Sequence, residues 1–407
     1  MRIVIIGAGP AGITAAETIR SLEPGAAISV ISAEPHPPYS PPALADYFLS
    51  GRSDTLFWKG RDVADRLGLD YRAGVGVASI DASGRRVALN DGGTLDYDEL
   101  VIASGSRLHA PIPGWDLPGV HDFKSLTTAE ALVDRVRRGE ARSALIVGAG
   151  FIGMEIALLL ADMGVAVTLL GRRGWLMPRM LDPETAAIAE TVMRARRVDV
   201  RLGVEAESFE GDTSVAGVRL ADGTLLTADL YVAATGVKPN IDFLAGSGIE
   251  TDWGIGVDDQ LRTSVTGVWA AGDAVEAPDR MTGKHYVHAI FPNAVDQGRI
   301  VGANVLGRST RYAGAESMNS LKHLGLPVMA VGLAEGETEL RWRAGDRLRK
   351  VFLTGGRIVG FRFAGEIGGG GVLRSLMLRG DDVRHFGRRL VEPGFGEGRL
   401  VQAALGR

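Results

Sequence analysis

The sequence predicts an α/β protein with two parallel-sheet domains and a smaller C-terminal domain of α+β type. Residues 3–22 and 144–164 each contain an apolar strand, a glycine-rich turn and an apolar-periodic helix. A second β-branched strand follows each of them, at residues 27–32 and 165–170. Strand, helix and strand in this order require a parallel sheet with a right-handed crossover. Toward the C-terminus, residues 348–366 instead predict a hairpin with Gly-Gly at its turn.

The composition is that of an ordinary globular chain, with 45% hydrophobic and 23% charged residues. A net charge of −4 gives no reason to expect nucleic acid or an anionic membrane surface as a partner. No apolar stretch reaches the roughly 20 residues of a membrane span, and the N-terminus lacks the features of a signal peptide. We therefore expect a cytoplasmic protein, with a homodimer left open.

The cysteine count restricts the chemistry of the chain. None of the 407 residues is a cysteine. Disulfides, thiolate nucleophiles and cysteine-held metal clusters are therefore excluded within this chain.

The first glycine turn has the spacing GxGxxG between a strand and a helix, which is the context of a dinucleotide site. Glycines at these positions allow a tight turn, close approach of a pyrophosphate and close helix–strand packing. Glu34 ends the next strand, where a carboxylate accepts hydrogen bonds from an adenosine ribose. The residues of this turn are Gly7, Gly9, Pro10, Ala11 and Gly12.

The second glycine turn repeats this pattern but ends its second strand differently. Arg172 and Arg173 stand where an acid would select NADH. Guanidinium groups favour a 2′-phosphate instead, so the pattern favours NADPH over NADH. The alternative is that both arginines are only solvated. The turn residues predicted to bind the nucleotide are Gly148, Gly150, Ile152 and Gly153.

Five motifs together carry a specific resemblance. They are GAGPAG, ASG, GAGFIGME, ATGVKPN and TSVTGVWAAGD. Over about residues 1–310 the chain resembles the pyridine nucleotide–disulfide oxidoreductase superfamily, whose members are flavoproteins with two dinucleotide-binding domains. The remaining residues resemble the C-terminal domain of the rubredoxin-reductase and nitrite-reductase-like branch.

This resemblance implies two Rossmann-like domains, with FAD at the first glycine turn and NAD(P)H at the second. The expected boundaries are 1–110 with 234–311 for FAD, 111–233 for NAD(P)H, and 312–407 for the α+β domain. It implies that Asp273 bonds the ribityl chain, although Asp273 could instead only cap a helix. The motifs add these cofactor contacts: Pro42, Ala103, Ser104, Gly105, Thr235, Gly236, Gly272, Asn293 and Ala294.

Two departures from the ferredoxin-reductase branch bear on catalysis. Phe291 occupies the position of a flavin-proximal tryptophan, and it is either a flavin-edge contact or a core aromatic. Asp46 occupies the position of a lysine that usually pairs with the glutamate of GxGxxGxE. Glu155 is that glutamate, so we expect it to have another partner or to contact the nicotinamide; the alternative is a helix-surface acid. From Pro42, the stretch PALADYFL predicts a helix beginning against the flavin.

The histidines do not form a convincing metal set. His285 and His288 are three residues apart, but the intervening Tyr-Val indicates a strand and therefore opposite faces. A position near the acceptor site remains open for this pair, and no metal is expected.

These observations favour an FAD-dependent NAD(P)H oxidoreductase that passes electrons to an external acceptor. The preferred acceptor is a small redox carrier such as rubredoxin or a ferredoxin. An NAD(P)H oxidase or a small-molecule or quinone reductase is the enzymatic alternative. A non-catalytic flavoprotein sensor, or a subunit of a larger complex, is the alternative from another class.

Overall fold

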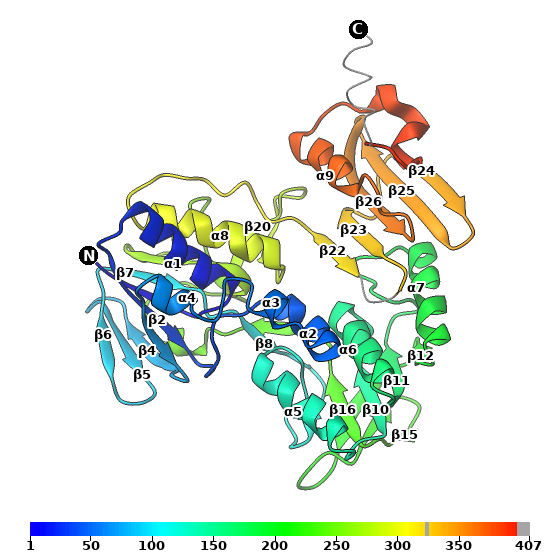
Figure 1. The fold of residues 1–407 in the computed structure, drawn as a ribbon, viewed down its shortest axis with the longest axis horizontal. Coiled ribbons are helices and arrows are strands. Elements are labelled where there is room, and N and C mark those ends of the chain that lie inside the picture. Colours follow the sequence, from blue (N-terminus) through cyan, green and yellow to red (C-terminus); the bar gives the residue numbers. More distant parts are fainter. Residues whose placement is uncertain (322–324, 397–407) are drawn as a thin grey trace. The chain divides into compact units, whose positions relative to one another are not determined.

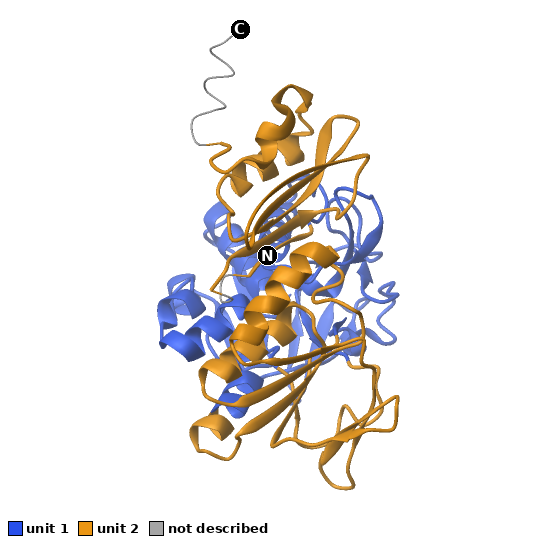
Figure 2. Ribbon diagram, turned by 90° about the vertical axis from the view of Figure 1, so that its right-hand side faces the viewer, with its two compact units in different colours: residues 1–109, 123–133, 236–316 blue, residues 110–122, 134–235, 317–407 orange. Residues whose placement is uncertain are grey.

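The computed structural model describes residues 1–321 and 325–396. Two parts of the predicted C-terminal domain therefore lie outside it, residues 322–324 and 397–407. The chain divides into two compact units (Figure 2). Unit 1 comprises residues 1–109, 123–133 and 236–316, and unit 2 comprises residues 110–122, 134–235 and the described residues from 317 onward.

Unit 1 is built on a five-stranded sheet of order β19-β7-β1-β2-β3, in which all pairs are parallel (Figure 1). The strands are β1 (Arg2–Ile6), β2 (Ala27–Ser32), β3 (Asp70–Ala73), β7 (Glu99–Ile102) and β19 (Val268–Ala270). Both faces of the central strands are buried, which explains why β1 is an unbroken apolar run.

Helices α1 (Pro10–Leu22) and α8 (Phe291–Asn304) pack side by side on this sheet (Figure 1). Glycines make the approach close: a Cβ on Gly298 would lie 2.3 Å from the carbonyl oxygen of Ala11, and one on Gly302 2.7 Å from that of Ala15. Smaller elements complete the unit. They are η1 (Pro41–Ala43), α2 (Leu44–Ser50), α3 (Ser53–Leu56), α4 (Val63–Arg66), η2 (Asp242–Leu244) and η3 (Gly272–Ala274).

Three small sheets also belong to unit 1. One is antiparallel and contains β4 (Val77–Asp81), β5 (Arg86–Leu89) and β6 (Thr94–Asp96). The second pairs β8 (Ser106–Leu108) with β17 (Val237–Pro239), and the third contains β18 (Ile255–Gly256), β20 (Val275–Pro278) and β21 (His285–Val287). Most of their strands lie in the sequence between strands of the parallel sheet, whereas β20 and β21 follow β19.

Unit 2 contains a second parallel sheet, of order β12-β11-β10-β16-β9. Its strands are β9 (Val120–His121), β10 (Ser143–Val147), β11 (Ala166–Gly171), β12 (Asp199–Leu202) and β16 (Leu230–Ala233). Its helices are α6 (Phe151–Asp162) and α7 (Pro183–Ala195), while α5 (Leu126–Arg137) begins in unit 1 and ends in unit 2. A small antiparallel sheet joins β13 (Ala206–Glu210), β14 (Gly217–Leu220) and β15 (Leu225–Leu226).

The C-terminal part of unit 2 is an antiparallel sheet of order β22-β23-β26-β25-β24. Its strands are β22 (Met318–Leu321), β23 (Val328–Gly332), β24 (Thr338–Ala344), β25 (Arg347–Thr354) and β26 (Arg357–Ala364); α9 (Gly370–Arg379) and η4 (Arg384–Val391) follow. The predicted hairpin turn is present, with φ of +58° at Gly355 and +77° at Gly356. The predicted α/β class with Rossmann-like sheets is confirmed.

Candidate functional site

The first glycine turn follows β1, and backbone atoms of unit 1 pack closely against two of its three glycines. Gly7 has a φ of +105°, and a Cβ there would lie 2.1 Å from the carbonyl oxygen of Ala103. A Cβ on Gly12 would lie 1.9 Å from the oxygen of Gly7. Gly9 is different, because a Cβ on it would have no neighbour within 4 Å. The turn is therefore sterically filled at its base and open at Gly9, where a pyrophosphate would approach.

The helix that begins at this turn leaves its N-terminus available to an anion. Gly9 is the N-cap of α1, with no side-chain cap, Pro10 lies in the first turn, and that turn contains no acid. Ala11 and Gly12 are buried. Uncapped N–H groups and the helix dipole together favour a phosphate at such an end.

Glu34 follows β2 and is held by a tyrosine that the sequence analysis did not include. The Tyr39 hydroxyl lies 2.8 and 3.0 Å from the two carboxylate oxygens of Glu34. The same hydroxyl accepts a hydrogen bond of 2.9 Å from the Leu126 N–H. Tyr39 is 8% exposed, so this arrangement fixes the orientation of the carboxylate while leaving it further lone pairs.

Residues 103–105 and Gly236 form the neighbouring loops of unit 1. The Ser104 hydroxyl donates to the Asn240 carbonyl at 2.7 Å, and the Asn240 N–H donates to the Gly105 carbonyl at 2.9 Å. The Gly236 carbonyl accepts from the His109 N–H at 3.0 Å. Ala103 touches the glycine turn directly, whereas the contacts of Ser104, Gly105 and Gly236 tie the loops to each other.

Asp273 lies in η3 and faces two donors that sequence reasoning missed. The Ser106 hydroxyl donates to its Oδ2 at 2.8 Å, and the Lys124 ammonium lies 2.9 Å from the same oxygen. The side chains of Lys124 and Asp273 are 29% and 17% exposed. Asp273 does not cap η3, whose N-cap is Ala271, and its contact to a ribityl chain stays a prediction. Lys124 lies 149 positions away in the sequence, so only the fold brings the two together.

The start of α8 fixes η3 and the end of unit 1. Gln297 accepts a hydrogen bond of 2.7 Å from the Gly272 N–H. Asn293 pairs with the backbone of Glu316, donating to its carbonyl and accepting from its N–H, both at 3.0 Å. Ala294, the residue after Asn293, is buried. The Asn293 side chain thus holds the end of unit 1, and its contact to a cofactor stays a prediction. Gln297 holds Gly272 and was not among the predicted site residues.

Phe291 begins α8 and packs against an aromatic residue from a distant segment. Its ring meets that of Trp58 edge to face, with centroids 5.2 Å apart. The Trp58 Nε1 is buried and has no hydrogen-bond partner. A buried donor without a partner needs an explanation, and an absent ligand is one. Phe291 thus forms an aromatic pair with Trp58, and the indole N–H of that pair is the donor left without a partner.

Pro42 and Asp46 belong to the segment after Glu34. The predicted helix is present, as η1 followed by α2, with Pro42 in η1 and exposed. Asp46 lies half-buried in the first turn of α2, and its carbonyl accepts from the Ser50 hydroxyl at 2.6 Å.

His285 and His288 lie at and just after β21, as the strand pattern predicted. His285 is exposed, while His288 is 6% exposed and lies 3.9 Å from Asp279 through its Nε2. Burial lowers the pKa of His288, against the opposing charge of Asp279. No group of three or more potential metal ligands occurs among the residues that the structure describes.

The second glycine turn, in unit 2, repeats the first. A Cβ on Gly148 (φ +120°) would lie 2.3 Å from the Ala234 oxygen and 3.0 Å from the Thr235 nitrogen. One on Gly153 would lie 1.9 Å from the Gly148 oxygen, whereas one on Gly150 would meet nothing within 4 Å. Gly150 caps α6 without a side chain, and the first turn of α6 contains no acid.

Two further residues of α6 were predicted for this site. Ile152 is 43% exposed, which is unusual for an isoleucine in so apolar a helix. Glu155 is half-buried one turn further along. Both lie on the first two turns of α6, near the open glycine.

Arg172 and Arg173 directly follow β11 and are exposed. The Arg172 guanidinium lies 3.8 Å from the Glu205 carboxylate, and the two side chains are 71% and 58% exposed. Such a surface pair contributes little to stability, so Arg172 keeps its freedom to bind another anion. The nearby Glu205 carboxylate would nevertheless oppose a 2′-phosphate.

Both turns therefore fit a dinucleotide. Each combines a blocked base, an open middle glycine and a helix N-terminus with no competing acid. Two such turns on two parallel sheets define a protein that binds two dinucleotides.

Residues 1–298 match the family model described as pyridine nucleotide-disulphide oxidoreductase. The chain belongs to this family, and the predicted membership is confirmed. The family and the similar proteins identify it as an FAD-dependent NAD(P)H oxidoreductase. In the described part of the chain, no helix has the length and apolarity that crossing a membrane requires.

Individual relatives show how broad the family is. The chain is 32% identical over 417 residues to the epsilon subunit of NADH-dependent phenylglyoxylate dehydrogenase of Aromatoleum evansii, which covers 100% of this chain and 98% of that one. It is 34% identical over 318 residues to rhodocoxin reductase of Rhodococcus erythropolis, covering 77% and 74%. A solved ferredoxin reductase of Rhodopseudomonas palustris aligns with a TM-score of 0.81 at 28% identity, covering 89% and 91%.

Proposed function

We propose that this protein takes electrons from NAD(P)H and delivers them to an external redox protein, in the first place a small carrier of the rubredoxin or ferredoxin type. The observation that carries the proposal is the absence of cysteine from all 407 residues. Without a thiol, the chain has no internal disulfide to accept electrons. They must leave the protein from the flavin itself. The similarity to rhodocoxin reductase and to a ferredoxin reductase supports a protein acceptor.

In this proposal unit 1 holds FAD. The turn at Gly9 and the N-terminus of α1 bind the pyrophosphate, Glu34 binds the ribose, and Asp273 binds the ribityl chain. Lys124 fixes the orientation of the Asp273 carboxylate. When bound, FAD supplies the chemistry, because it accepts a hydride from NAD(P)H and releases the two electrons singly.

The second turn holds NAD(P)H through Gly150 and the N-terminus of α6. Glu155 lies close enough in sequence to this turn to contact the nicotinamide, and we assign it that role. Phe291, with Trp58, shields the flavin edge from water. The chain itself supplies alignment and exclusion of water rather than acid–base catalysis.

Charge reversal at Arg172 tests the preference for NADPH. We expect Arg172→Glu to lower the ratio of kcat/KM for NADPH to that for NADH by about tenfold, since one charge-assisted hydrogen bond to the 2′-phosphate contributes about 1.5 kcal/mol. Steady-state kinetics with both nucleotides measures the ratio. Glu205→Gln, which removes the opposing carboxylate, should raise it. An unchanged ratio in both variants would discard the role of Arg172.

One specific observation favours a second function. The end-to-end match to the epsilon subunit of an NADH-dependent dehydrogenase makes a subunit of a larger complex the second candidate. The flavin chemistry would then be the same, but the external redox protein would be a partner subunit. The two candidates differ in one respect. A partner subunit would form a stable complex with this chain, whereas a small carrier would not.

An acceptor screen tests the proposed function directly. The purified, FAD-loaded protein is mixed with NADH or NADPH in a stopped-flow instrument, and flavin absorbance is followed. We expect bleaching by at least one nucleotide, followed by reoxidation that rubredoxin or ferredoxin accelerates at least tenfold over oxygen. If oxygen consumption accounts for all the NAD(P)H lost and neither carrier accelerates turnover, the carrier proposal fails. No bleaching with either nucleotide would reject a reductase of any kind.

A further inference from the structure

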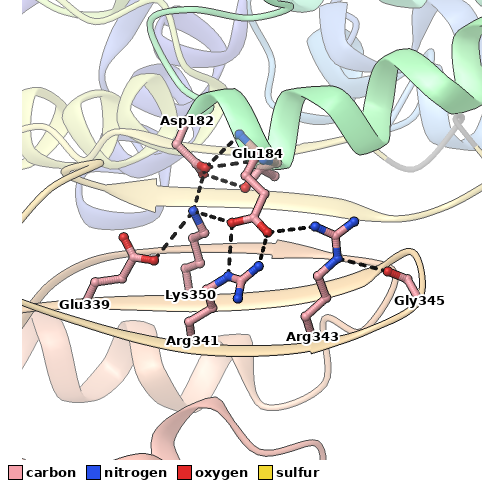
Figure 3. A network of polar contacts seen from close by, with 8 residues as sticks. Asp182, Glu184, Glu339, Arg341, Arg343, Gly345 and Lys350 are labelled. Carbon is pink, nitrogen blue, oxygen red and sulfur yellow. Dashed lines mark hydrogen bonds and ion pairs between the residues drawn. The ribbon is translucent and has the colours of Figure 1, made fainter.

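A buried ammonium group connects the C-terminal sheet of unit 2 to helix α7. Lys350, on β25, is only 8% exposed at its side chain. Its Nζ lies 2.8 Å from Asp182 Oδ1, 2.9 Å from Glu184 Oε2 and 3.6 Å from Glu339 Oε1 (Figure 3). Burial works to lower the pKa of Lys350, but the hydrogen bonds to Asp182 and Glu184 outweigh it and raise that pKa. The group is therefore charged and held by carboxylates on α7.

Two arginines of β24 reinforce the same contact. Arg341 donates to both carboxylate oxygens of Glu184, and Arg343 Nη1 donates to Oε1 at 2.8 Å (Figure 3). The hydrogen bond from Arg341, together with those from Lys350 and Arg343, lowers the pKa of Glu184 to about 2. Glu184 is thus ionised throughout the neutral range. Its carboxylate is held by three cations of one sheet.

One of the carboxylates that Lys350 contacts, that of Asp182, caps the start of α7. Asp182 is the N-cap of α7, and its Oδ1 accepts from the N–H groups of Glu184 at 3.1 Å and Thr185 at 3.3 Å. The hydroxyl of Thr185 donates to Oδ2 at 2.5 Å. Lys350 binds the same carboxylate, so the C-terminal sheet fixes the first turn of the helix.

The loop that leads into α7 begins at Arg172 and ends at Leu181, and it touches the second glycine turn. The Met177 N–H donates to the carbonyl of Ala149, inside that turn, at 2.9 Å. The Trp175 Nε1 donates to the Leu181 carbonyl at 3.1 Å, next to the cap residue. A continuous set of contacts therefore leads from the cap of α7 through this loop to the glycine turn.

We propose that Lys350 is a positioning residue for the nucleotide site: it acts through Asp182 to fix the loop 172–181 against the glycine turn. The inference rests on the proposed binding of NAD(P)H at that turn. A buried ion pair adds little stability compared with apolar residues of the same volume. Its oriented hydrogen bonds do, however, specify one position of the α7 cap. The C-terminal sheet thereby contributes to nucleotide affinity without contacting the nucleotide.

The test removes the charge and keeps the length of the side chain. Lys350→Met, in the full-length FAD-loaded protein, should raise the Kd for NAD⁺ or NADP⁺ and the KM for the reduced nucleotide about threefold to thirtyfold. The kcat with ferricyanide should stay within about twofold, and the flavin content should not change. Lys350→Arg should recover most of the affinity, because it restores the cation.

A matched variant on the same sheet controls for general destabilisation. Arg357, on β26, donates to the Gly380 carbonyl at 2.9 Å and not to α7. Arg357→Met should lower Tm without changing KM. If Lys350→Met changes Kd and KM by less than twofold, or no more than Arg357→Met does, the proposal is overturned.

Two further measurements cover the remaining outcomes. If Lys350→Met does not fold, Asp182→Asn replaces it, because this change weakens the ion pair with Lys350 and keeps a side-chain oxygen that can cap α7. An unchanged KM in that variant overturns the proposal. If the wild-type protein binds neither nucleotide, the proposed function fails, and the positioning of the loop 172–181 by Lys350 is judged separately by hydrogen exchange. Faster exchange of residues 172–181 in Lys350→Met than in wild type supports this positioning, and equal exchange rejects it.

Discussion

Replacing Gly9 by alanine is expected to leave unit 1 folded while lowering its affinity for FAD about tenfold to a hundredfold. The backbone at Gly9 (φ −70°, ψ −175°) suits any residue, and a Cβ there would touch no protein atom within 4 Å. The added methyl would instead occupy the space of the pyrophosphate. Overpacking of this kind costs about 1–3 kcal/mol, which corresponds to that loss of affinity. Titration of the apoprotein with FAD measures it.

Two matched variants make this prediction specific. Gly12→Ala should unfold unit 1 rather than merely weaken FAD binding, because its Cβ would lie 1.9 Å from the Gly7 oxygen. Gly150→Ala should keep the flavin and lose reduction by NAD(P)H, because only the second turn is blocked. If Gly9→Ala bound FAD as tightly as the wild type, the first turn would not be the pyrophosphate site.

The sequence was sufficient to predict features that depend on local pattern. A strand, a GxGxxG turn and a helix repeated at two places predicted both parallel sheets, because each pattern fixes a crossover within about 30 residues. The hairpin at Gly355 and Gly356 was equally predictable, since a turn with two positive φ angles requires such residues. The helix following Glu34 was indicated by prolines at its start.

Contacts between distant segments could not be predicted in the same way. Tyr39 is five residues from Glu34, yet its second partner is the backbone of Leu126. Gln297 lies 25 residues from Gly272, and the sequence does not show that its side chain accepts from the Gly272 N–H. A single sequence carries no signal for such pairs, because they join a loop or a short helix to a helix from a distant part of the chain.

The basic residues of β25 are a second case in which partners from distant segments could not be predicted from the sequence. From the sequence, the run RLRK at residues 347–350 predicts a solvated basic face, with docking of a carrier protein as the lesser alternative. The structure instead buries both Arg349 and Lys350. Burial of a charge is tolerated only where carboxylates or carbonyls compensate it, and those partners come from α7 and from the loop before α9. Local charge density therefore indicates a surface only when no such partner is folded against it.

The second large effect is expected at Asp273, where Asp273→Ala should yield a protein purified largely without flavin. Removing this carboxylate leaves Lys124 and Ser106 without their shared acceptor and removes the proposed contact to the ribityl chain. A hydrogen bond to a charged group contributes about 1.5–3 kcal/mol, so the loss of the proposed ribityl contact should weaken FAD binding about tenfold to a hundredfold. The Lys124 ammonium left without its carboxylate should weaken the site further. The ratio of flavin to protein absorbance after gel filtration measures the effect.

The control for Asp273 is another aspartate of unit 1 that also pairs with a cation. Asp242, bound to Arg107, is 70% exposed, and Asp242→Ala should change flavin content by less than about a quarter because exposed pairs contribute about 0–1 kcal/mol. Adding Lys124→Met to Asp273→Ala separates the two roles of the carboxylate. If Asp273 only neutralises Lys124, the double variant regains both Tm and flavin, and the ribityl contact is rejected. If Asp273 also binds FAD, the double variant regains Tm and stays flavin-free.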